Sequence, residues 1–432
     1  RALPRLSTLR VHVFGELKLG PGMAAAPLRE LDAPHLTVPL AGLAPASRTL
    51  VETAELIVGG DRHLEMVTND AARKIVWEFP LDGLIGKLKA AHENRIVVLA
   101  TGDPMAFGIG STLARHFDPD DMTILPAPSA FSLAAARLAW PLHGCTCLTL
   151  HGRPLELLNH HLHPGRRLLI LSHDGTTPAQ IAELLRDAGF GASPITVLEN
   201  MGAETETRRA ARAADWSGAR VEDLNTVAVE CVAGPEARIL TPVPGLPDDA
   251  FSHDGQMTKR VVRAATIAAL APLPGQILWD LGAGCGSVAI EWLRAAQNIQ
   301  GRGARAVAVE RDPKRCDMAA RNAARLGTPF LEIIEGDIRT AMPGLPDPNA
   351  VFIGGSLSTD AGLIDAAWDR LRPGGRLVAN TVTIEGERAL LGAHARDGGD
   401  LTRIAVSHAD PLGELTGWRP AMPVTQWGAT KP

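Results

Sequence analysis

The sequence predicts an α/β protein with two domains in one chain. Short β-like runs alternate with helical stretches along most of its length, which is the pattern of sheets covered by helices. At 432 residues the chain is also too long for one ordinary hydrophobic core. A stretch dense in Pro and Gly, 233–255, is the best candidate for a linker. We therefore expect domains at 35–232 and 256–432, preceded by a segment, 1–34, to which the sequence assigns no fold.

The predicted elements follow in chain order. The β-like runs of the first domain lie at 56–58, 96–100, 168–172, 195–199 and 226–231, and its helical stretches include 109–117, 131–138 and 178–188. The β-like runs of the second domain lie at 277–280, 306–310, 331–335, 350–353 and 376–381. Both series indicate sheets whose strands are joined through helices.

Composition argues against several classes of function. The formal net charge of −5 provides no general basic field for nucleic acid or an anionic membrane, so we expect neither as a partner. No apolar run reaches the length needed to span a bilayer. Five scattered cysteines suit neither a disulfide framework nor a zinc site, so we expect a cytoplasmic protein without a bound metal.

The most informative stretch is 279–286, Trp-Asp-Leu-Gly-Ala-Gly-Cys-Gly. A short apolar run precedes it, and a helical pattern begins at Ser287. A strand, a glycine turn and a helix N-terminus together can cradle a nucleotide-type ligand. The spacing is G-x-G-x-G, whereas a dinucleotide fold requires G-x-G-x-x-G. This spacing disfavours a nicotinamide-dependent oxidoreductase.

Acidic residues follow the next two predicted strands. Glu310 ends the run at 306–310, where the two oxygens of a carboxylate can accept both ribose hydroxyls; the alternative is a solvated Glu before a helix. Asp337 follows the third strand, where it can meet an adenine amino group or cap the helix at 338–341. Gly354 and Gly355 end the fourth strand and leave space for a substrate.

The first domain has a second candidate loop. The run at 96–100 leads into Gly102-Asp103-Pro104-Met105 and then a helix. By itself this loop is equally well an ordinary turn or a place where an acid holds a ligand amine or hydroxyl.

These motifs, taken together, resemble known methylases. The second domain resembles class I S-adenosylmethionine (SAM) methyltransferases with a Rossmann-like fold, and more closely the decarboxylating precorrin methylases, through 253–260, 277–292, 351–355, 374–380 and 417–420. The resemblance implies a SAM site formed by the residues Thr258, Gly282, Ala283, Gly284, Cys285, Gly286, Glu310, Asp337, Ile338 and Gly354. Ser356 stands where these methylases often have a third glycine, and we expect this departure to narrow the substrate opening slightly.

The first domain resembles tetrapyrrole methylases, which bind SAM between two α/β subdomains. The matching stretches are 58–64, 97–111, 126–132, 150–154 and 174–179. They imply a second SAM site formed by Gly102, Asp103, Pro104, Met105, Ser129 and Ala130. One departure is that the family opens with a strand ending in Gly-x-Gly, whereas 36–45 contains only Gly42 and is interrupted by Pro39. From this we expect a first strand that is shortened or replaced.

The resemblance implies SAM-dependent methylation of precorrin-6B at C5 and C15, with decarboxylation of the C12 acetate to give precorrin-8X in cobalamin synthesis. The second domain would act at C15 and the first at C5. The alternative is that only the C-terminal half is active and the first domain is a degenerate binding or assembly module. Amino-directed nucleic-acid methylases, another rival, usually carry an (Asn/Asp)-Pro-Pro-(Tyr/Phe) loop after the fourth strand, where this chain has Ile353-Gly-Gly-Ser.

The implied substrate carries many carboxylates, which basic side chains can bind. The candidates are Arg62, His63, Arg153, Lys259 and Arg260, each of which competes with a simple surface ion pair. The sequence identifies no general base and no metal ligands. The partners we expect are a small tetrapyrrole and further copies of the chain, as a homo-oligomer.

Overall fold

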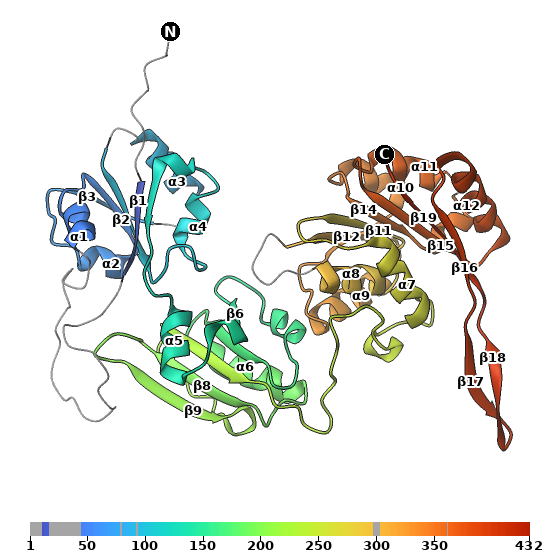
Figure 1. The fold of residues 1–432 in the computed structure, drawn as a ribbon, viewed down its shortest axis with the longest axis horizontal. Coiled ribbons are helices and arrows are strands. Elements are labelled where there is room, and N and C mark those ends of the chain that lie inside the picture. Colours follow the sequence, from blue (N-terminus) through green and yellow to red (C-terminus); the bar gives the residue numbers. More distant parts are fainter. Residues whose placement is uncertain (1–10, 17–44, 78–79, 92–93, 297–302, 361) are drawn as a thin grey trace, which may run out of the picture. The chain divides into compact units, whose positions relative to one another are not determined.

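The computed structural model describes residues 11–16, 45–77, 80–91, 94–296, 303–360 and 362–432 (Figure 1). Contacts divide it into two compact units. The first comprises Arg1–His151, Arg167–Glu183 and Ser193–Glu230, and the second comprises Gly152–Arg166, Leu184–Ala192 and Cys231–Pro432. Two stretches that are internal to the predicted first domain therefore pack with the second unit.

The first sheet of unit 1 is parallel and has the strand order β3-β2-β4-β1-β5. Its strands are β1 (Val11–Glu16), β2 (Leu56–Gly59), β3 (Arg73–Val76), β4 (Ile96–Thr101) and β5 (Met122–Leu125). The helices associated with it are α1 (Pro45–Glu52), α2 (Asp61–Glu65), α3 (Asp82–Ala90) and α4 (Ile109–Leu113). Alternate residues of β2 and β4 face opposite ways, so Ile57 and Val97 join one buried cluster while Val58 and Val98 join another.

Strand β1 corrects the prediction made for the N-terminal segment. Residues 11–16 lie inside the sheet, where β1 pairs with both β4 and β5. The expectation of no fold for 1–34 is therefore wrong for these six residues. The segment 36–45, at which the sequence predicts a shortened or replaced first strand, lies outside the described residues except for Pro45. The strand that pairs with β4 and β5 is β1, which lies earlier in the chain.

The second sheet of unit 1 is mixed and has the order β6-β7-β10-β8-β9. Its strands are β6 (Cys145–Thr149), β7 (Arg167–Leu171), β8 (Pro194–Glu199), β9 (Thr207–Arg212) and β10 (Asn225–Glu230). Helix α5 (Ala130–Leu138) packs on it through Phe131 and Ala134, and α6 (Thr177–Asp187) follows β7. Two α/β subdomains thus make up the N-terminal half, as the resemblance implied.

The C-terminal sheet has seven strands in the order β13-β12-β11-β14-β15-β19-β16. The strands are β11 (Ile277–Leu281), β12 (Arg305–Glu310), β13 (Glu332–Glu335), β14 (Ala350–Ile353), β15 (Arg376–Thr381), β16 (Asp400–Ile404) and β19 (Val424–Thr430). The first five are parallel to one another, and β19 is antiparallel to β15 and β16. Strand order reverses beside β11, which is where an open α/β sheet binds ligands.

Helices cover both faces of this sheet (Figure 1). The cluster on one face joins Leu278 and Ala308 to α7 (Arg260–Leu270), α8 (Ser287–Ala296) and α9 (Pro313–Arg325). The cluster on the other face joins Trp279 and Val309 to α10 (Ile338–Ala341), α11 (Leu363–Arg370) and α12 (Ile384–Asp397). Because side chains alternate along β11 and β12, each face of the sheet has its own hydrophobic core, and the glycine turn lies between the two cores.

The segment predicted as a linker, 233–255, is fixed to the second unit by buried side chains and hydrogen bonds. Leu246, Ala250 and Phe251 are buried in the same cluster as α7 and α8. The N–H groups of Gly245 and Leu246 donate to the carboxylate of the buried Glu291, at 2.6 and 2.9 Å. Among the residues that the structure describes, no helix is long and apolar enough to cross a membrane.

A histidine cluster in unit 2 gives a prediction for stability against pH. Burial lowers the pKa of His160 to about 3 and that of His161 to about 4, and the charges of Arg294 and Arg166 act in the same direction. In the unfolded chain an imidazole binds a proton below about pH 6.5, whereas these buried imidazoles stay neutral to a lower pH. Their contribution to the free energy of unfolding is therefore fully present above about pH 6.5 and is lost as the pH falls. Burial raises the pKa of Asp280 to about 7, so this residue contributes stability at low pH that is lost as the pH rises. Over part of the same pH range it therefore opposes the effect of the histidines.

We expect His160→Gln to flatten the fall in the free energy of unfolding between pH 6 and 4 by up to about 1.4 kcal/mol per pH unit. Chemical denaturation at a series of pH values measures this slope. The matched control is His408→Gln, at an exposed position of the C-terminal region. A slope that His160→Gln leaves unchanged would contradict the prediction.

Candidate functional site

The glycine turn of the C-terminal sheet lies between β11 and α8, as the sequence predicts. Gly282, Gly284 and Gly286 all have positive φ, at 81°, 58° and 78°, which favours glycine. A Cβ built on Gly286 would lie 3.1 Å from the Cβ of Ala319, so this glycine allows α8 and α9 to pack closely. A Cβ built on Gly284 would have only the carbonyl oxygen of Gln256 near it, at 3.8 Å. Gly284 is therefore the position of the turn at which a ligand has room.

Glu310 is bound to this turn through its own carboxylate. Its Oε2 accepts the N–H of Gly284 at 2.8 Å, and its Oε1 accepts those of Arg311 and Asp312 at 2.9 and 3.0 Å. A carboxylate has about four acceptor positions, so one remains, on Oε2. Glu310 can then accept one ribose hydroxyl in this arrangement, which is narrower than the expectation from sequence that its two oxygens take both.

Asp280 is a polar residue of the site region that the sequence did not nominate. It lies in β11, two residues before Gly282, and is only 1% exposed. Its Oδ2 accepts the N–H of Ala289 at 3.0 Å, whereas no donor within the described parts of the chain reaches Oδ1. Burial, together with the nearby charge of Glu310, raises the pKa of Asp280 to about 7. An acid inside an otherwise apolar strand was the available sequence signal.

Most of the remaining C-terminal candidates lie at the carboxyl edge of the parallel strands, whereas Thr258 precedes α7 and its carbonyl oxygen accepts a hydrogen bond from Arg263 at 2.6 Å. Ile338 and Gly354 follow β13 and β14, whose register with β12 and β11 aligns their ends. Asp337 caps α10 by accepting the N–H of Thr340 at 3.2 Å, which confirms the capping alternative. Ala283 and the buried Cys285 complete the turn, with the N–H of Ala283 donating to Val309.

Ser356 lies against the turn. A Cβ built on Gly282 would lie 2.6 Å from the Oγ of Ser356, so the hydroxyl occupies the space beside that glycine. The side chain therefore lies close to the backbone of the cradle. This is consistent with the expectation that a serine here narrows the opening.

The N-terminal candidate loop follows β4, at the carboxyl edge of the first sheet. A Cβ built on Gly102, where φ is 64°, would lie 3.5 Å from the carbonyl oxygen of Pro128 and 3.6 Å from the nitrogen of Ala130. The structure thus brings together the two stretches that the resemblance nominated. Asp103 accepts the N–H of Met105 at 2.8 Å, and Ser129 caps α5 by accepting the N–H of Ser132.

The conformation of this loop depends on its close packing against the start of α4. Cβ atoms built on Gly108 and Gly110 would lie 2.7 and 2.9 Å from the carbonyl oxygen of Pro104, so both glycines are required for the start of α4 to approach the loop. Met105 is 46% exposed and Phe107 41%, and the ring of Phe107 meets that of Phe131 edge-on at 5.7 Å. Exposed apolar side chains beside a glycine loop are typical of a surface that binds a ligand or a partner.

Two of the basic candidates lie close to the N-terminal loop. His63, in α2, is buried and its Nε2 lies 3.1 Å from the Oγ1 of Thr101, the residue before Gly102. Arg62 donates to the same hydroxyl at 3.4 Å. The first sheet therefore places a guanidinium and an imidazole beside the loop, where they could contact a substrate carboxylate.

The other basic candidates are placed differently. Arg260 donates from Nε to the carbonyl of Gly245 at 2.9 Å, and Lys259 donates to the carbonyl of Gly255 at 3.2 Å. Arg153 is exposed and belongs to unit 2, whereas the loop at 102–105 belongs to unit 1. Within the described ranges, no group of three or more His, Cys, Asp or Glu side chains is placed to hold a metal ion.

Comparison with known proteins agrees with both halves. The family model for a precorrin methyltransferase domain matches residues 249–431, and that for tetrapyrrole (corrin/porphyrin) methylases matches 40–216. A precorrin-6Y C(5,15)-methyltransferase [decarboxylating] from Sinorhizobium sp is 46% identical over 396 residues, which cover 91% of this chain and 94% of that protein.

Shorter relatives match parts of the chain. A probable cobalt-precorrin-6B C(15)-methyltransferase (decarboxylating) from Pyrobaculum aerophilum is 31% identical over 186 residues, covering 42% of this chain and 93% of its own. A cobalt-precorrin-7 C(5)-methyltransferase from Salmonella typhimurium is 28% identical over 167 residues, covering 38% of this chain and 81% of its own.

The fold and the matched domains define an α/β methylase that joins a tetrapyrrole methylase domain to a class I SAM methyltransferase-like domain. The identity over nearly the whole chain goes further. The chain belongs to the family of decarboxylating precorrin-6Y C(5,15)-methyltransferases.

Proposed function

We propose that the two domains divide the family's reaction, methylation of a precorrin at C5 and C15 with decarboxylation in cobalamin biosynthesis, between them. The C-terminal domain methylates C15 and promotes loss of CO2 from the C12 acetate, and the N-terminal domain methylates C5. The existence of shorter relatives named for each single reaction supports a division of this kind.

The observation that carries the proposal is the open, glycine-lined position at Gly284 beside the carboxylate of Glu310, whose Oε2 accepts the N–H of Gly284. The residues present suit a SAM nucleoside: a small turn for close approach, and one acceptor position left on Glu310 for a ribose hydroxyl. When bound, SAM supplies an electrophilic methyl group for in-line transfer to a nucleophilic carbon. The task left to the protein is to hold and orient the reactants and to exclude water.

The N-terminal site is proposed to hold a second SAM at the loop of Gly102, Asp103, Pro104 and Met105, beside Ser129 and Ala130. The degenerate-module alternative rested on a first strand that was expected to be shortened or replaced. Because β1 is present inside the sheet, that observation no longer favours it. Arg62 and His63 are the basic side chains we propose for substrate carboxylates in this domain.

Counting SAM sites tests this proposal. Calorimetric titration with S-adenosylhomocysteine, the demethylated product of SAM, should give two sites per chain. A stoichiometry of one would overturn the assignment of a site to each domain. Gly284→Asp should remove one of the two sites and identify it as the C-terminal one.

We also propose that the chain forms a homo-oligomer through the hairpin of β17 (Ser407–Leu412) and β18 (Leu415–Pro420), which extends from the C-terminal sheet (Figure 1). Its pairing places Ala409, Pro411 and Trp418 on one face, and Trp418 is 77% exposed. An isolated two-stranded hairpin is marginally stable, so a partner on this apolar face is expected to stabilise it. The chain is further proposed to be cytoplasmic, as composition suggested.

We expect Trp418→Glu to shift the chain toward monomer in sedimentation velocity, because a charge would then lie in the contact. His408→Glu, on the opposite face of the hairpin, should not. A monomeric wild-type chain, or an oligomer that Trp418→Glu leaves intact, would contradict the proposal.

A further inference from the structure

The segment 252–258 runs past the open side of the glycine turn and is held there by side chains from two helices. The carbonyl oxygen of Gln256, in this segment, lies 3.8 Å from the position of a Cβ on Gly284. We refer to residues 252–258 as the strap. Since no regular element lies in the strap, its position depends on the groups that bind it.

The beginning of the strap is fixed to the turn by Asn322 of α9, which is fully buried. The N–H of Ser252 donates to its Oδ1 at 2.8 Å, and its Nδ2 donates to the carbonyl of Ser252 at 2.9 Å. The same Nδ2 donates to the carbonyl of Cys285 at 3.0 Å. One amide side chain therefore ties the strap to the cradle.

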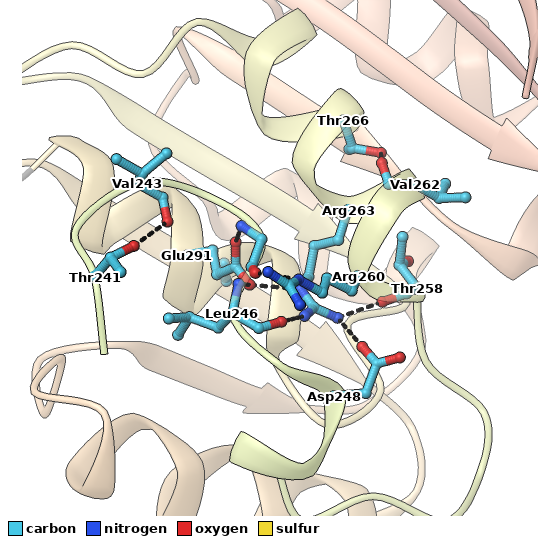
Figure 2. A network of polar contacts seen from close by, with 12 residues as sticks. Thr241, Val243, Leu246, Asp248, Thr258, Arg260, Val262, Arg263, Thr266 and Glu291 are labelled. Atoms are coloured by element: carbon cyan, nitrogen blue, oxygen red, sulfur yellow. Dashed lines mark hydrogen bonds and ion pairs between the residues drawn. The ribbon is translucent and has the colours of Figure 1, made fainter. Parts of the chain in front are cut away.

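The end of the strap is fixed by Arg263 of α7, which is also fully buried (Figure 2). Its NH1 donates to the carbonyl of Thr258 at 2.6 Å and to Asp248 at 2.9 Å, and its Nε donates to Glu291 at 2.6 Å. Removing this arginine would leave Glu291 buried without its cation, at a cost of several kcal/mol in stability. Arg263 is therefore a poor place to test function apart from folding.

The middle of the strap is held by Arg315, at the start of α9. Its Nε donates to Oδ2 of Asp254 at 2.9 Å and its NH2 donates to Oε1 of Gln256 at 2.7 Å. The hydrogen bonds from Gln256 and Arg315 lower the pKa of Asp254, so the carboxylate is charged at neutral pH. The Arg315 side chain is 24% exposed, and it can be changed without opening a core.

We propose that Arg315 is a positioning residue that sets the affinity of the C-terminal site for the nucleoside of SAM by holding the strap against the glycine turn. The inference rests on the proposed SAM site at Gly282–Gly286. If the strap leaves its place in most molecules once Arg315 is removed, the apparent dissociation constant rises in proportion. A strap that is in place in one molecule in ten, for example, gives a rise of about tenfold.

The test uses the full chain and local hydrogen exchange, which reports on each site separately. In Arg315→Ala without ligand, the amides of 253–258 should exchange faster than in the wild type. Titration with S-adenosylhomocysteine, followed at peptides from this segment, should show binding about tenfold weaker. Peptides covering 102–105 should titrate as in the wild type. Arg321→Ala is the matched control, since Arg321 is an exposed arginine of the same helix with no hydrogen bond or ion pair to other described residues.

A double-mutant cycle with Asp254→Asn separates positioning from general destabilisation. If Arg315 acts through the strap, each single variant weakens binding and the double variant is little worse than either one. Arg315→Lys should restore part of the affinity, because an ammonium can pair with Asp254 but cannot also reach Gln256 in the same fork geometry. For methylation, the KM for SAM at C15 should rise while kcat changes little.

Two failures can be told apart. If wild-type peptides from 252–258 and 282–286 show no protection by the ligand, the proposed SAM site itself is wrong. If the wild type is protected and Arg315→Ala binds equally well with unchanged exchange, the site stands and the positioning role is overturned.

Discussion

Gly284→Asp is expected to lower C15 methylation and decarboxylation by more than about 100-fold while C5 methylation continues. A Cβ at this position meets only the carbonyl oxygen of Gln256, at 3.8 Å, so the new side chain fits into the space that the ligand requires. It also brings a negative charge next to Glu310, whose carboxylate already binds the N–H of Gly284. The positive φ of 58° adds a backbone cost of about 1–2 kcal/mol, which is smaller than the free energy of unfolding of an ordinary domain.

The control for this variant is Gly275→Asp. Gly275 also has a positive φ, 80°, and a Cβ there meets nothing within 4 Å, but it precedes β11 whereas the turn follows that strand. The two variants therefore share the added charge and the backbone strain and differ in which end of the strand they occupy. Mass spectrometry of the products measures both methylations. C15 methylation that survives in Gly284→Asp would contradict the proposed cradle.

Val13→Pro is expected to abolish C5 methylation and leave C15 methylation and decarboxylation intact. Val13 lies in β1 opposite Val98 of β4 and Ile124 of β5, so the strand is paired on both sides. Proline removes the N–H and is excluded from central strands. The lost hydrogen bond and its unsatisfied partner cost about 1–3 kcal/mol before any steric term. The C-terminal sheet has its own buried clusters and does not depend on β1.

Val13→Ala is the matched control, because alanine keeps the backbone N–H that pairing requires. Calorimetry should show a lowered transition in Val13→Pro, and product analysis should show one methyl group added in place of two. A Val13→Pro chain with full C5 activity would show that β1 is not needed for the N-terminal site.

Local sequence signals were sufficient for the C-terminal cradle. The turn at 282–286, the acid at Glu310 and the helix start at Ser287 lie within short stretches whose spacing is fixed by strand and helix geometry. For the same reason the strand at 277–281 and the capping of α10 by Asp337 could be anticipated. The sheet order around β11 follows once the domain class is recognised.

What the sequence could not provide depends on contacts between distant residues. The run at 11–16 is too short and too isolated to distinguish from irregular chain, and only its pairing with β4 and β5 makes it a strand. The interruption by Pro39 concerns 36–45, which is not the segment that forms β1. The ion pair of Arg315 with Asp254 joins residues 61 positions apart, which no motif reports. The buried state of Asp280 likewise follows from packing rather than from spacing.

The measurement that tests the account most directly is mass spectrometry of precorrin-6B incubated with SAM and the full chain. Two domains that both act should add two methyl groups and release one CO2 per molecule of product. A product with one added methyl and loss of CO2 would contradict the claim that the N-terminal site is active, and an unchanged substrate would contradict the reaction proposed for the chain.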